Sequence, residues 1–137
     1  MDITISTDLV ASEYLELVNA IGWKNLKTEQ VERGLNNSMF KYKAVINGKT
    51  VGMARLVGDF GCHGMLTDVV VHPDYQGKGI GKKLVMEIMK SINDMLTPGD
   101  KFLVELLPCA GKRDFYIKLG FKYKPENMDG MYLWFEK

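Results

Sequence analysis

The stretch HPDYQGKGIGKKLVMEIM, residues 72–89, joins a valine-rich segment to an apolar pattern of helical period. Three glycines, Gly77, Gly79 and Gly81, occupy alternate positions where that helix should begin. Glycine is a poor helix former, because its backbone loses more conformational freedom on ordering than that of any other residue. We therefore expect the missing side chains to serve another purpose at this turn.

A glycine turn at the start of a helix is suited to binding an anion. The first backbone N–H groups of a helix have no partner within it, and the helix dipole places partial positive charge there. Without side chains in the way, a ligand can approach these groups closely, and phosphate is the anion most often bound so. Lys78, Lys82 and Lys83 add positive charge. The turn therefore predicts a phosphate-bearing ligand.

Two common phosphate motifs do not fit the spacing of this turn. The P-loop requires G-x-x-x-x-G-K-[ST], but Gly77 to Gly81 is one residue short and Lys83 replaces the hydroxyl that binds magnesium. The dinucleotide fingerprint requires G-x-G-x-x-G within βαβ units, whereas the chain has G-x-G-x-G. Residues 76–81 do fit a third pattern, [QR]-x-x-G-x-[GA].

The rest of the chain predicts alternating short strands and helices. Alternation of apolar and polar residues on either side of Asn47-Gly48 predicts a hairpin with a type I′ turn. Asp8 or Ser12 is expected to cap the first helix. The expected elements are a strand at 2–6, a helix ending at Gly22, a helix at 28–35, the hairpin at 40–58, a strand at 65–72, a helix at 79–95, a strand at 101–107, a helix at 111–120 and strands at 121–123 and 131–135.

This order, β-α-α-β-β-β-α-β-α-β-β, predicts the α+β class, with a mixed, largely antiparallel central sheet flanked by helices. We expect residues 1–137 to form a single domain. A net charge of +1 argues against nucleic acid as a partner. No apolar run approaches the roughly 20 residues that span a bilayer, and no signal segment is present, so we expect no membrane and a cytoplasmic location.

The two cysteines, Cys62 and Cys109, form no CxxC pair, and the histidines lie at no metal-ligand spacing from them. We therefore expect two free thiols and no metal.

The sequence resembles the GNAT superfamily of N-acetyltransferases. The resemblance rests on the [QR]-x-x-G-x-[GA] stretch, on FYIKLGF at residues 115–121, which is similar to a Y-x-x-x-G-F segment of that family, and on the order of elements. It implies that acetyl-CoA is the cosubstrate and that Val69, Val70 and Val71 contact its pantetheine arm. It also implies that the pyrophosphate is bound by Gln76, Gly77, Lys78, Gly79, Ile80, Gly81 and Lys82.

The resemblance implies that Tyr116 is a general acid that protonates the departing thiolate. An unperturbed tyrosine pKa of about 10 keeps the phenol protonated at neutral pH. The other interpretation is an aromatic ring that packs helix against sheet, as Phe115 and Phe121 are expected to do. For the base, Asp68 could accept a proton or hold a cationic substrate, or it could simply bond to nearby backbone. Strand alternation places Thr67 and Val69 on the face opposite to Asp68. Glu105 and a water relay are the alternatives.

One position departs from the family pattern. Relatives often have asparagine and alanine where this chain has Cys109 and Lys112. Cys109 as a nucleophile is the less favoured interpretation, because no histidine is paired with it in sequence.

The acceptor is expected to be a small-molecule amine, with a homodimer left open. The segments expected to line its pocket are residues 20–30 and the loop at 124–131. Trp23, Tyr42, Tyr132 and Trp134 either form an aromatic wall there or pack in the core. The competing functions are a non-catalytic acetyl-CoA-binding sensor or scaffold, which would not need Tyr116, and a nucleotide-binding protein.

Overall fold

The computed structural model describes residues 2–123 and 130–137, and its elements follow the order expected from the sequence. The helices are α1 (Ala11–Ala20), α2 (Thr28–Asn36), α3 (Ile80–Met95) and α4 (Arg113–Lys118), with a short 3₁₀ turn at Pro73–Tyr75. The strands are β1 (Thr4–Ser6), β2 (Phe40–Ile46), β3 (Lys49–Gly58), β4 (His63–Val71), β5 (Lys101–Leu106), β6 (Lys122–Tyr123) and β7 (Met131–Glu136). The 3₁₀ turn was not predicted.

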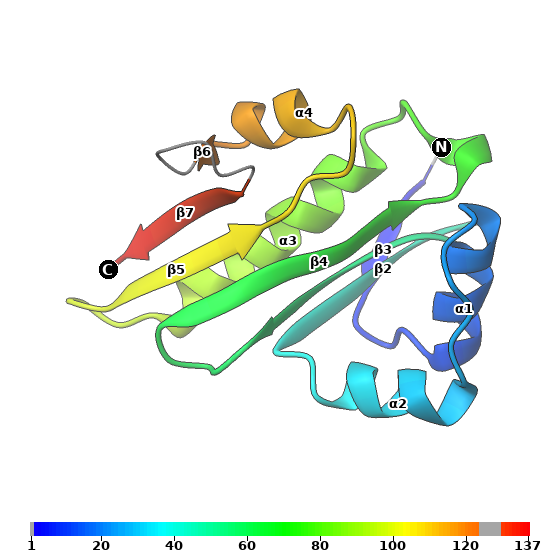
Figure 1. Ribbon diagram of the computed structural model, residues 1–137, viewed down its shortest axis with the longest axis horizontal. Coiled ribbons are helices and arrows are strands. Elements are labelled where there is room, and N and C mark those ends of the chain that lie inside the picture. The colour runs from blue at the N-terminus through cyan, green and yellow to red at the C-terminus, as the bar shows by residue number, and fades with distance from the viewer. Residues whose placement is uncertain (1, 124–129) are drawn as a thin grey trace.

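The strands form one sheet in the order β1-β2-β3-β4-β5-β7-β6 (Figure 1). Every neighbouring pair is antiparallel except β4 and β5, which are parallel. The predicted mixed, largely antiparallel sheet is therefore confirmed. The predicted hairpin is also present, with φ of 49° at Asn47 and 75° at Gly48. Positive φ at both central residues is the signature of a type I′ turn.

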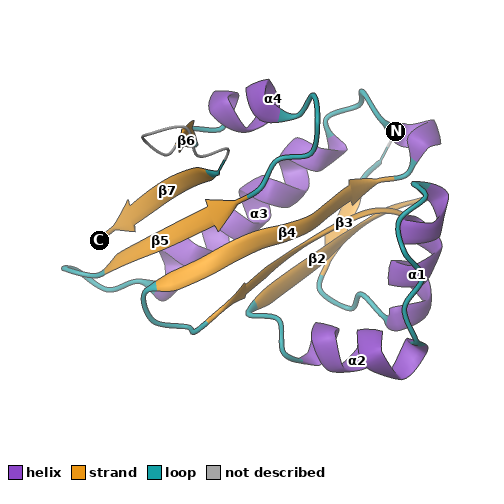
Figure 2. Ribbon diagram, viewed as in Figure 1, coloured by secondary structure: helices purple, strands orange, loops and turns teal. Residues whose placement is uncertain are grey.

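Helices cover both faces of this sheet (Figure 2). On one face α3 packs over the central strands through Ile80, Leu84, Val85, Ile88 and Ile92, all at most 1% exposed. This is the apolar stripe that the helical period predicts. On the other face α1 and α2 pack on Met53 and Val70. The sheet therefore separates two hydrophobic clusters, one under α3 and the other under α1 and α2.

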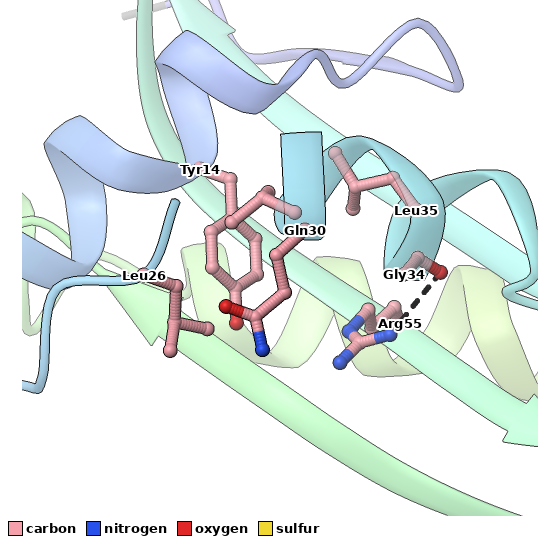
Figure 3. A pocket seen from close by; sticks show the side chains of 7 residues that line it. Tyr14, Leu26, Gln30, Gly34, Leu35 and Arg55 are labelled. Atoms are coloured by element: carbon pink, nitrogen blue, oxygen red, sulfur yellow. Dashed lines mark hydrogen bonds between the residues drawn. The ribbon is translucent and has the colours of Figure 1, made fainter. Parts of the chain in front are cut away.

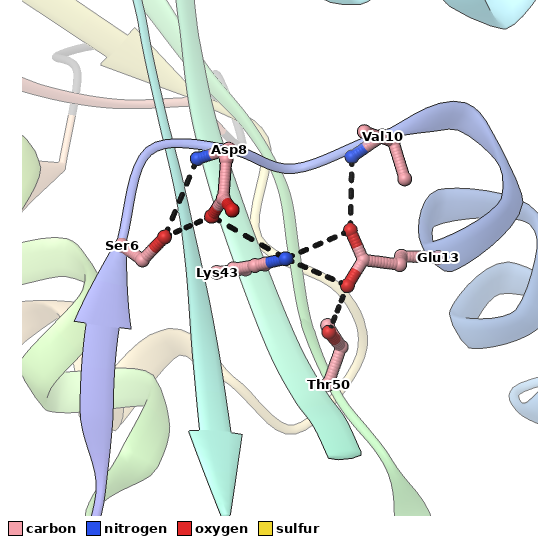
Figure 4. Close-up of polar contacts among 6 residues, drawn as sticks. All are labelled: Ser6, Asp8, Val10, Glu13, Lys43 and Thr50. Atoms are coloured by element: carbon pink, nitrogen blue, oxygen red, sulfur yellow. Dashed lines mark hydrogen bonds and ion pairs between the residues drawn. The ribbon is translucent and has the colours of Figure 1, made fainter. Parts of the chain in front are cut away.

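The prediction for the cap of α1 was wrong. The helix begins at Ala11, after Val10, and the Val10 N–H donates to Glu13 Oε1 at 3.0 Å. Glu13 also pairs with Lys43, with Nζ 2.8 Å from Oε2, and accepts from the Thr50 hydroxyl (Figure 4). Asp8 instead contacts Ser6 and Lys43. A carboxylate three residues inside the helix can satisfy the N-terminal backbone as well as a capping side chain does.

A bulge in β4 breaks the alternation expected from the sequence. Asp68 has φ of 51°, and the register with β3 passes from Arg55↔Thr67 to Met53↔Val70, so that two residues of β4 face one of β3. As a result Leu66 packs in the cluster under α3, whereas Val70 packs under α1 and α2. Strict alternation would have placed both on one face.

The strand β4 separates from β5 soon after it begins. The two strands pair only over residues 63–65 and 103–105. Among the described residues, the remaining part of β4 has no strand partner on that side, and β4 runs well past the end of β5 (Figure 1). The backbone groups on this edge are therefore available to a ligand.

In the described part of the chain, no helix is long and apolar enough to cross a membrane.

Candidate active site

The glycine turn at residues 76–81 opens the N-terminus of α3 to a ligand. Gly77 and Gly79 have φ of 77° and 80°, which is the left-handed conformation that favours glycine. Among the described residues, apart from its chain neighbours, a Cβ atom at either position would meet no atom within 4 Å, so the space beside the turn is open. The Gln76 amide donates to the Val71 carbonyl at 3.0 Å and ties the turn to the end of β4. The turn is therefore shaped to bring an anion close to the helix N-terminus.

The third glycine has different surroundings. A Cβ atom at Gly81 would lie 3.5 Å from the Phe115 ring and 3.8 Å from a Val71 methyl. Because these distances are ordinary van der Waals contacts, Gly81 differs from the other two glycines in facing α4 and β4 instead of open space, and a methyl group would fit there.

Lysines surround the turn, including one that sequence analysis missed. The Nζ of Lys78 lies 5.6 Å from the centre of the Tyr75 ring, and the Nζ of Lys49 lies 5.8 Å from it. Lys49 comes from the β2–β3 hairpin, which the His72 N–H bond to the Val51 carbonyl holds beside the turn. Lys82 lies on the first turn of α3. These cations favour a phosphate ligand, and only the tertiary structure could place Lys49 among them.

Tyr116 is buried on α4, with 8% of its surface exposed. Its ring meets those of Phe115 and Phe121 edge-on, with centroids 4.9 and 5.9 Å away. Burial and, to a lesser extent, the Cys109 thiol raise the pKa of Tyr116 to about 12. The phenol is therefore a packed aromatic and, at neutral pH, a protonated donor. The geometry is compatible with both interpretations of this residue.

Asp68 is held by two side chains that lie far from it in sequence. Its Oδ2 accepts from Arg55 Nε at 2.6 Å and from the Tyr14 hydroxyl at 2.9 Å. Arg55 Nη1 continues the network to Ser38 Oγ at 3.3 Å, just after the C-terminal end of α2. Burial and the Asp68 charge raise the pKa of Tyr14 to about 12. No sequence signal linked these residues, because Tyr14 lies 54 positions and Arg55 13 positions from Asp68.

The bulge also corrects the expected side-chain directions around Asp68. Arg55 is the cross-strand partner of Thr67 and reaches Asp68 itself. Since directly paired residues share a face, Thr67 lies on the same face as Asp68 and not opposite to it. Val69 packs against the cluster under α3 and lies on the other face, as predicted.

Glu105 lies at the last paired position before β4 and β5 separate. Its Oε1 is 2.5 Å from His63 Nε2, and its side chain is 18% exposed. His63 thus begins β4 and contacts a candidate base. His72 Nδ1 instead accepts from the Asp74 N–H at 3.1 Å, at the start of the 3₁₀ turn.

The structure does not bring the four candidate aromatics together. Tyr42 packs toward α3, where its hydroxyl lies 2.5 Å from Ser91 Oγ, and Trp134 is 49% exposed on β7. Trp23 follows α1 at the other end of the sheet and is 41% exposed. Residues 124–129 of the predicted acceptor loop lie outside the described residues. Cys62 and Cys109 are free and exposed, as expected.

A small pocket of about 190 Å³ lies between α1, α2 and β3, next to the Asp68 network (Figure 3). Tyr14 and Arg55, which both bind Asp68, are among the residues that line it.

Known proteins support the family indicated by this geometry. The model of the acetyltransferase (GNAT) domain matches residues 40–123. The uncharacterized N-acetyltransferase ycf52 of Pyropia yezoensis is 30% identical over 129 residues, which cover 91% of this chain and 71% of that protein.

The chain belongs to the GNAT family of acetyltransferases. It is an N-acetyltransferase, as the resemblance predicted.

Two solved structures share the fold of this chain. A protein of unknown function from meticillin-resistant Staphylococcus aureus superposes with a TM-score of 0.83 at 26% identity, covering 96% of this chain and 98% of its own. A GNAT acetyltransferase from Brucella melitensis, solved with acetyl-CoA, has a TM-score of 0.72 at 20% identity and covers 99% and 90% of the two chains.

Proposed function

We propose that this GNAT protein transfers the acetyl group of acetyl-CoA directly to the primary amine of a small molecule. The observation that carries the proposal is the open glycine turn at the N-terminus of α3, which directly follows the unpaired edge of β4. The acetyl-CoA bound to the structural relative from Brucella melitensis supports the choice of cosubstrate.

The two features match the two parts of the cosubstrate. The free edge of β4 at Val69, Val70 and Val71 offers backbone groups to the amides of the pantetheine arm. The turn that follows offers backbone N–H groups to the pyrophosphate, over residues 76–82. Lys49 and Lys78 add charge at the outer end of this path. The residues present therefore fit acetyl-CoA along its length.

The reaction requires a neutral amine, a stabilised oxyanion and a protonated leaving group. The amine nitrogen attacks the thioester carbonyl, the new C–N bond forms, and the C–S bond breaks as coenzyme A leaves as a thiolate. Tyr116 is the proposed acid for this thiolate, since its phenol is protonated at neutral pH. The proton of the incoming amine passes to Asp68, to Glu105 or to a water relay.

The two candidate carboxylates differ in their surroundings. Asp68 Oδ2 is already occupied by Arg55 and Tyr14, and Glu105 is in contact with His63. His63 is half exposed, so it offers a path by which a proton taken up by Glu105 can reach solvent. Glu105 also stands where β4 and β5 separate, beside the expected position of the thioester.

A small acceptor is supported by the modest volume of the pocket beside Asp68, about 190 Å³. The net charge of +1 provides no strong field for a highly charged polymer.

We propose that residues 1–137 act as a single domain, and a homodimer is not needed for this chemistry.

The test is a panel of primary amines screened for thiol release from acetyl-CoA. We expect release that depends on the amine and on the chain. Calorimetry with coenzyme A and ATP, run beside the screen, separates the rival functions. Binding of acetyl-CoA without release for any amine would favour a sensor, and tighter binding of ATP than of coenzyme A would favour a nucleotide-binding protein.

A further inference from the structure

The pocket between α1, α2 and β3 is lined by both polar and apolar side chains (Figure 3). Its polar side chains are those of Tyr14, Gln30 and Arg55, and its apolar walls include Leu26 and Val31. A volume of about 190 Å³ is roughly that of six water molecules in the liquid. The pocket therefore suits a group of a few heavy atoms and not a folded partner.

Arg55 is the one charged side chain among the described residues that line this pocket. Its Nε is engaged by Asp68, and its Nη1 by Ser38 and the Gly34 carbonyl. Among the described residues, its Nη2 has no hydrogen-bond partner. Asp68 is not among the described lining residues. The guanidinium is thus fixed in place and keeps donors for a ligand that enters the pocket.

The pocket lies one strand away from the expected place of acetyl transfer. Arg55 on β3 is the direct partner of Thr67 on β4, and no strand in the described part of the chain pairs with the opposite edge of β4 at that point. Neighbouring strands are about 4.8 Å apart. The pocket opens on the face covered by α1 and α2, whereas Phe102, Val104 and Leu106 fill the α3 face with at most 2% exposure. An acceptor must therefore approach from the side on which Arg55 lies.

We propose that this pocket binds a carboxylate of the acceptor, so that the substrate is a small amino-carboxylate, with its amine at the edge of β4 and its carboxylate on Arg55 and Gln30. This inference rests on the proposed function and names its substrate class. An arginine whose planar head is held by other bonds is well suited to a carboxylate, because little side-chain freedom is lost on binding.

The first test compares matched acceptors that differ only in the carboxylate. Phenylalanine, methionine, lysine and 4-aminobutyrate are each assayed against the amine that lacks the carboxylate. At least one pair is expected to show a kcat/KM about ten- to a hundredfold higher for the carboxylated member, which is the usual effect of a hydrogen bond to a charged group. Equal or lower values for every carboxylated member would overturn the proposal.

Variants of Gln30 test the position of the carboxylate without disturbing Arg55. Gln30 is exposed on α2, so its substitution should not affect folding. In Gln30→Glu the preference for the carboxylated member should fall at least about threefold, and in Gln30→Lys it should rise, because the sign of the added charge is reversed. Glu32→Gln is the matched control, since it changes charge on an exposed residue of α2 that does not line the pocket. If Glu32→Gln changes the ratio of kcat/KM between the carboxylated and uncarboxylated acceptors as strongly as Gln30→Lys does, the effect is not local to the pocket and the proposed site is contradicted.

A binding measurement separates this inference from the proposed function. The N-acetylated derivatives of the same compounds are titrated into ¹⁵N-labelled protein while the Arg55 Nε–H signal is followed. We expect tighter binding of the carboxylated derivatives and a shift of the Arg55 Nε–H signal, and we expect the tighter binding to be lost in Arg55→Gln. Absence of thiol release with this preference intact would count against the catalytic proposal alone. Thiol release with no preference and no Arg55 shift would count against the carboxylate site alone.

Discussion

At the scale of single residues, Tyr116 and Asp68 show how burial changes the interpretation of a candidate. Tyr116 packs against two phenylalanine rings and also has a pKa raised to about 12. Packing therefore does not argue against an acid, since the same burial keeps the phenol protonated. Asp68 is a charged partner of Arg55, and any test of it as a base must allow for that structural role.

Tyr116→Phe should reduce turnover by about 10²–10⁴-fold, the usual range for loss of acid–base catalysis, with little change in coenzyme A affinity. The ring and its packing stay, and only the donor proton is lost. Steady-state kinetics with calorimetry for coenzyme A measure both quantities. A normal rate in folded Tyr116→Phe protein would leave the residue a purely packing aromatic and favour the sensor.

Asp68→Asn should lower the free energy of unfolding by about 1–3 kcal/mol, because it leaves the half-buried Arg55 without its counter-charge. If Asp68 is the base, the rising limb of kcat/KM against pH should also disappear in the folded variant. Selectivity for cationic over neutral acceptors should fall with it.

Glu105→Gln is the parallel variant for this experiment. If the rising limb of kcat/KM against pH is lost in Glu105→Gln but retained in Asp68→Asn, Glu105 is the base and Asp68 is a positioning residue. If the pH profile of kcat/KM is unaltered in both variants, neither carboxylate is the base, and the water relay is the remaining candidate.

At the scale of elements, the turn between β4 and α3 depends on backbone conformation more than on side chains. Gly77 and Gly79 are both left-handed and both open to space. A side chain at Gly79 would therefore have two effects. It would strain the backbone, and it would occupy the approach to the N–H groups of α3.

Gly79→Val should weaken coenzyme A binding by at least tenfold and should also lower the melting temperature by several degrees. The strain of a non-glycine residue in this conformation is about 1–2 kcal/mol. Gly99→Val is the matched control, because Gly99 has φ of 95°, is equally open and lies in the turn between α3 and β5. Gly99→Val should show a similar decrease in melting temperature but should bind coenzyme A as tightly as the parent chain. Equal loss of affinity in both variants would mean that general destabilisation, and not the turn, explains the effect.

At the scale of the whole molecule, polar contacts at the base of α1 join two helices to the sheet. Tyr14 connects α1 to β4 through Asp68, and Arg55 connects β3 to α2 through the Gly34 carbonyl. The pKa of Tyr14, raised by burial and by Asp68, makes this connection sensitive to alkaline pH. A tyrosine with folded and unfolded pKa values of about 12 and 10 contributes stability that is complete below pH 10 and lost as the pH rises toward 12.

The free energy of unfolding, measured in urea, should therefore fall between pH 10 and 12. For Lys43, ion pairs with Glu13 and Asp8 outweigh the effect of burial and raise the pKa, which adds a loss of the same sign. The tyrosine contribution is isolated by Tyr14→Phe, in which the decrease should be smaller than in the parent chain. An identical decrease in both chains would show that Tyr14 does not ionise on unfolding in this range.

The sequence by itself determined the family, the order of elements and the position of the glycine turn before α3. These follow from local patterns: the period of apolar residues, Asn47-Gly48 at the hairpin, and glycines before an apolar helix. Both the fold class and the family were confirmed. The roles assigned to the predicted site residues stay predictions.

Only the tertiary structure decided what surrounds the candidate catalytic groups. The bulge at Asp68 reversed the faces of the residues after it, and a single left-handed residue inside a strand leaves no mark in an alternating pattern. The partners of Asp68 and Glu105, and the pocket over Arg55, come from elements far apart in the chain. Their proximity depends on the order of strands in the sheet, which local sequence patterns do not encode.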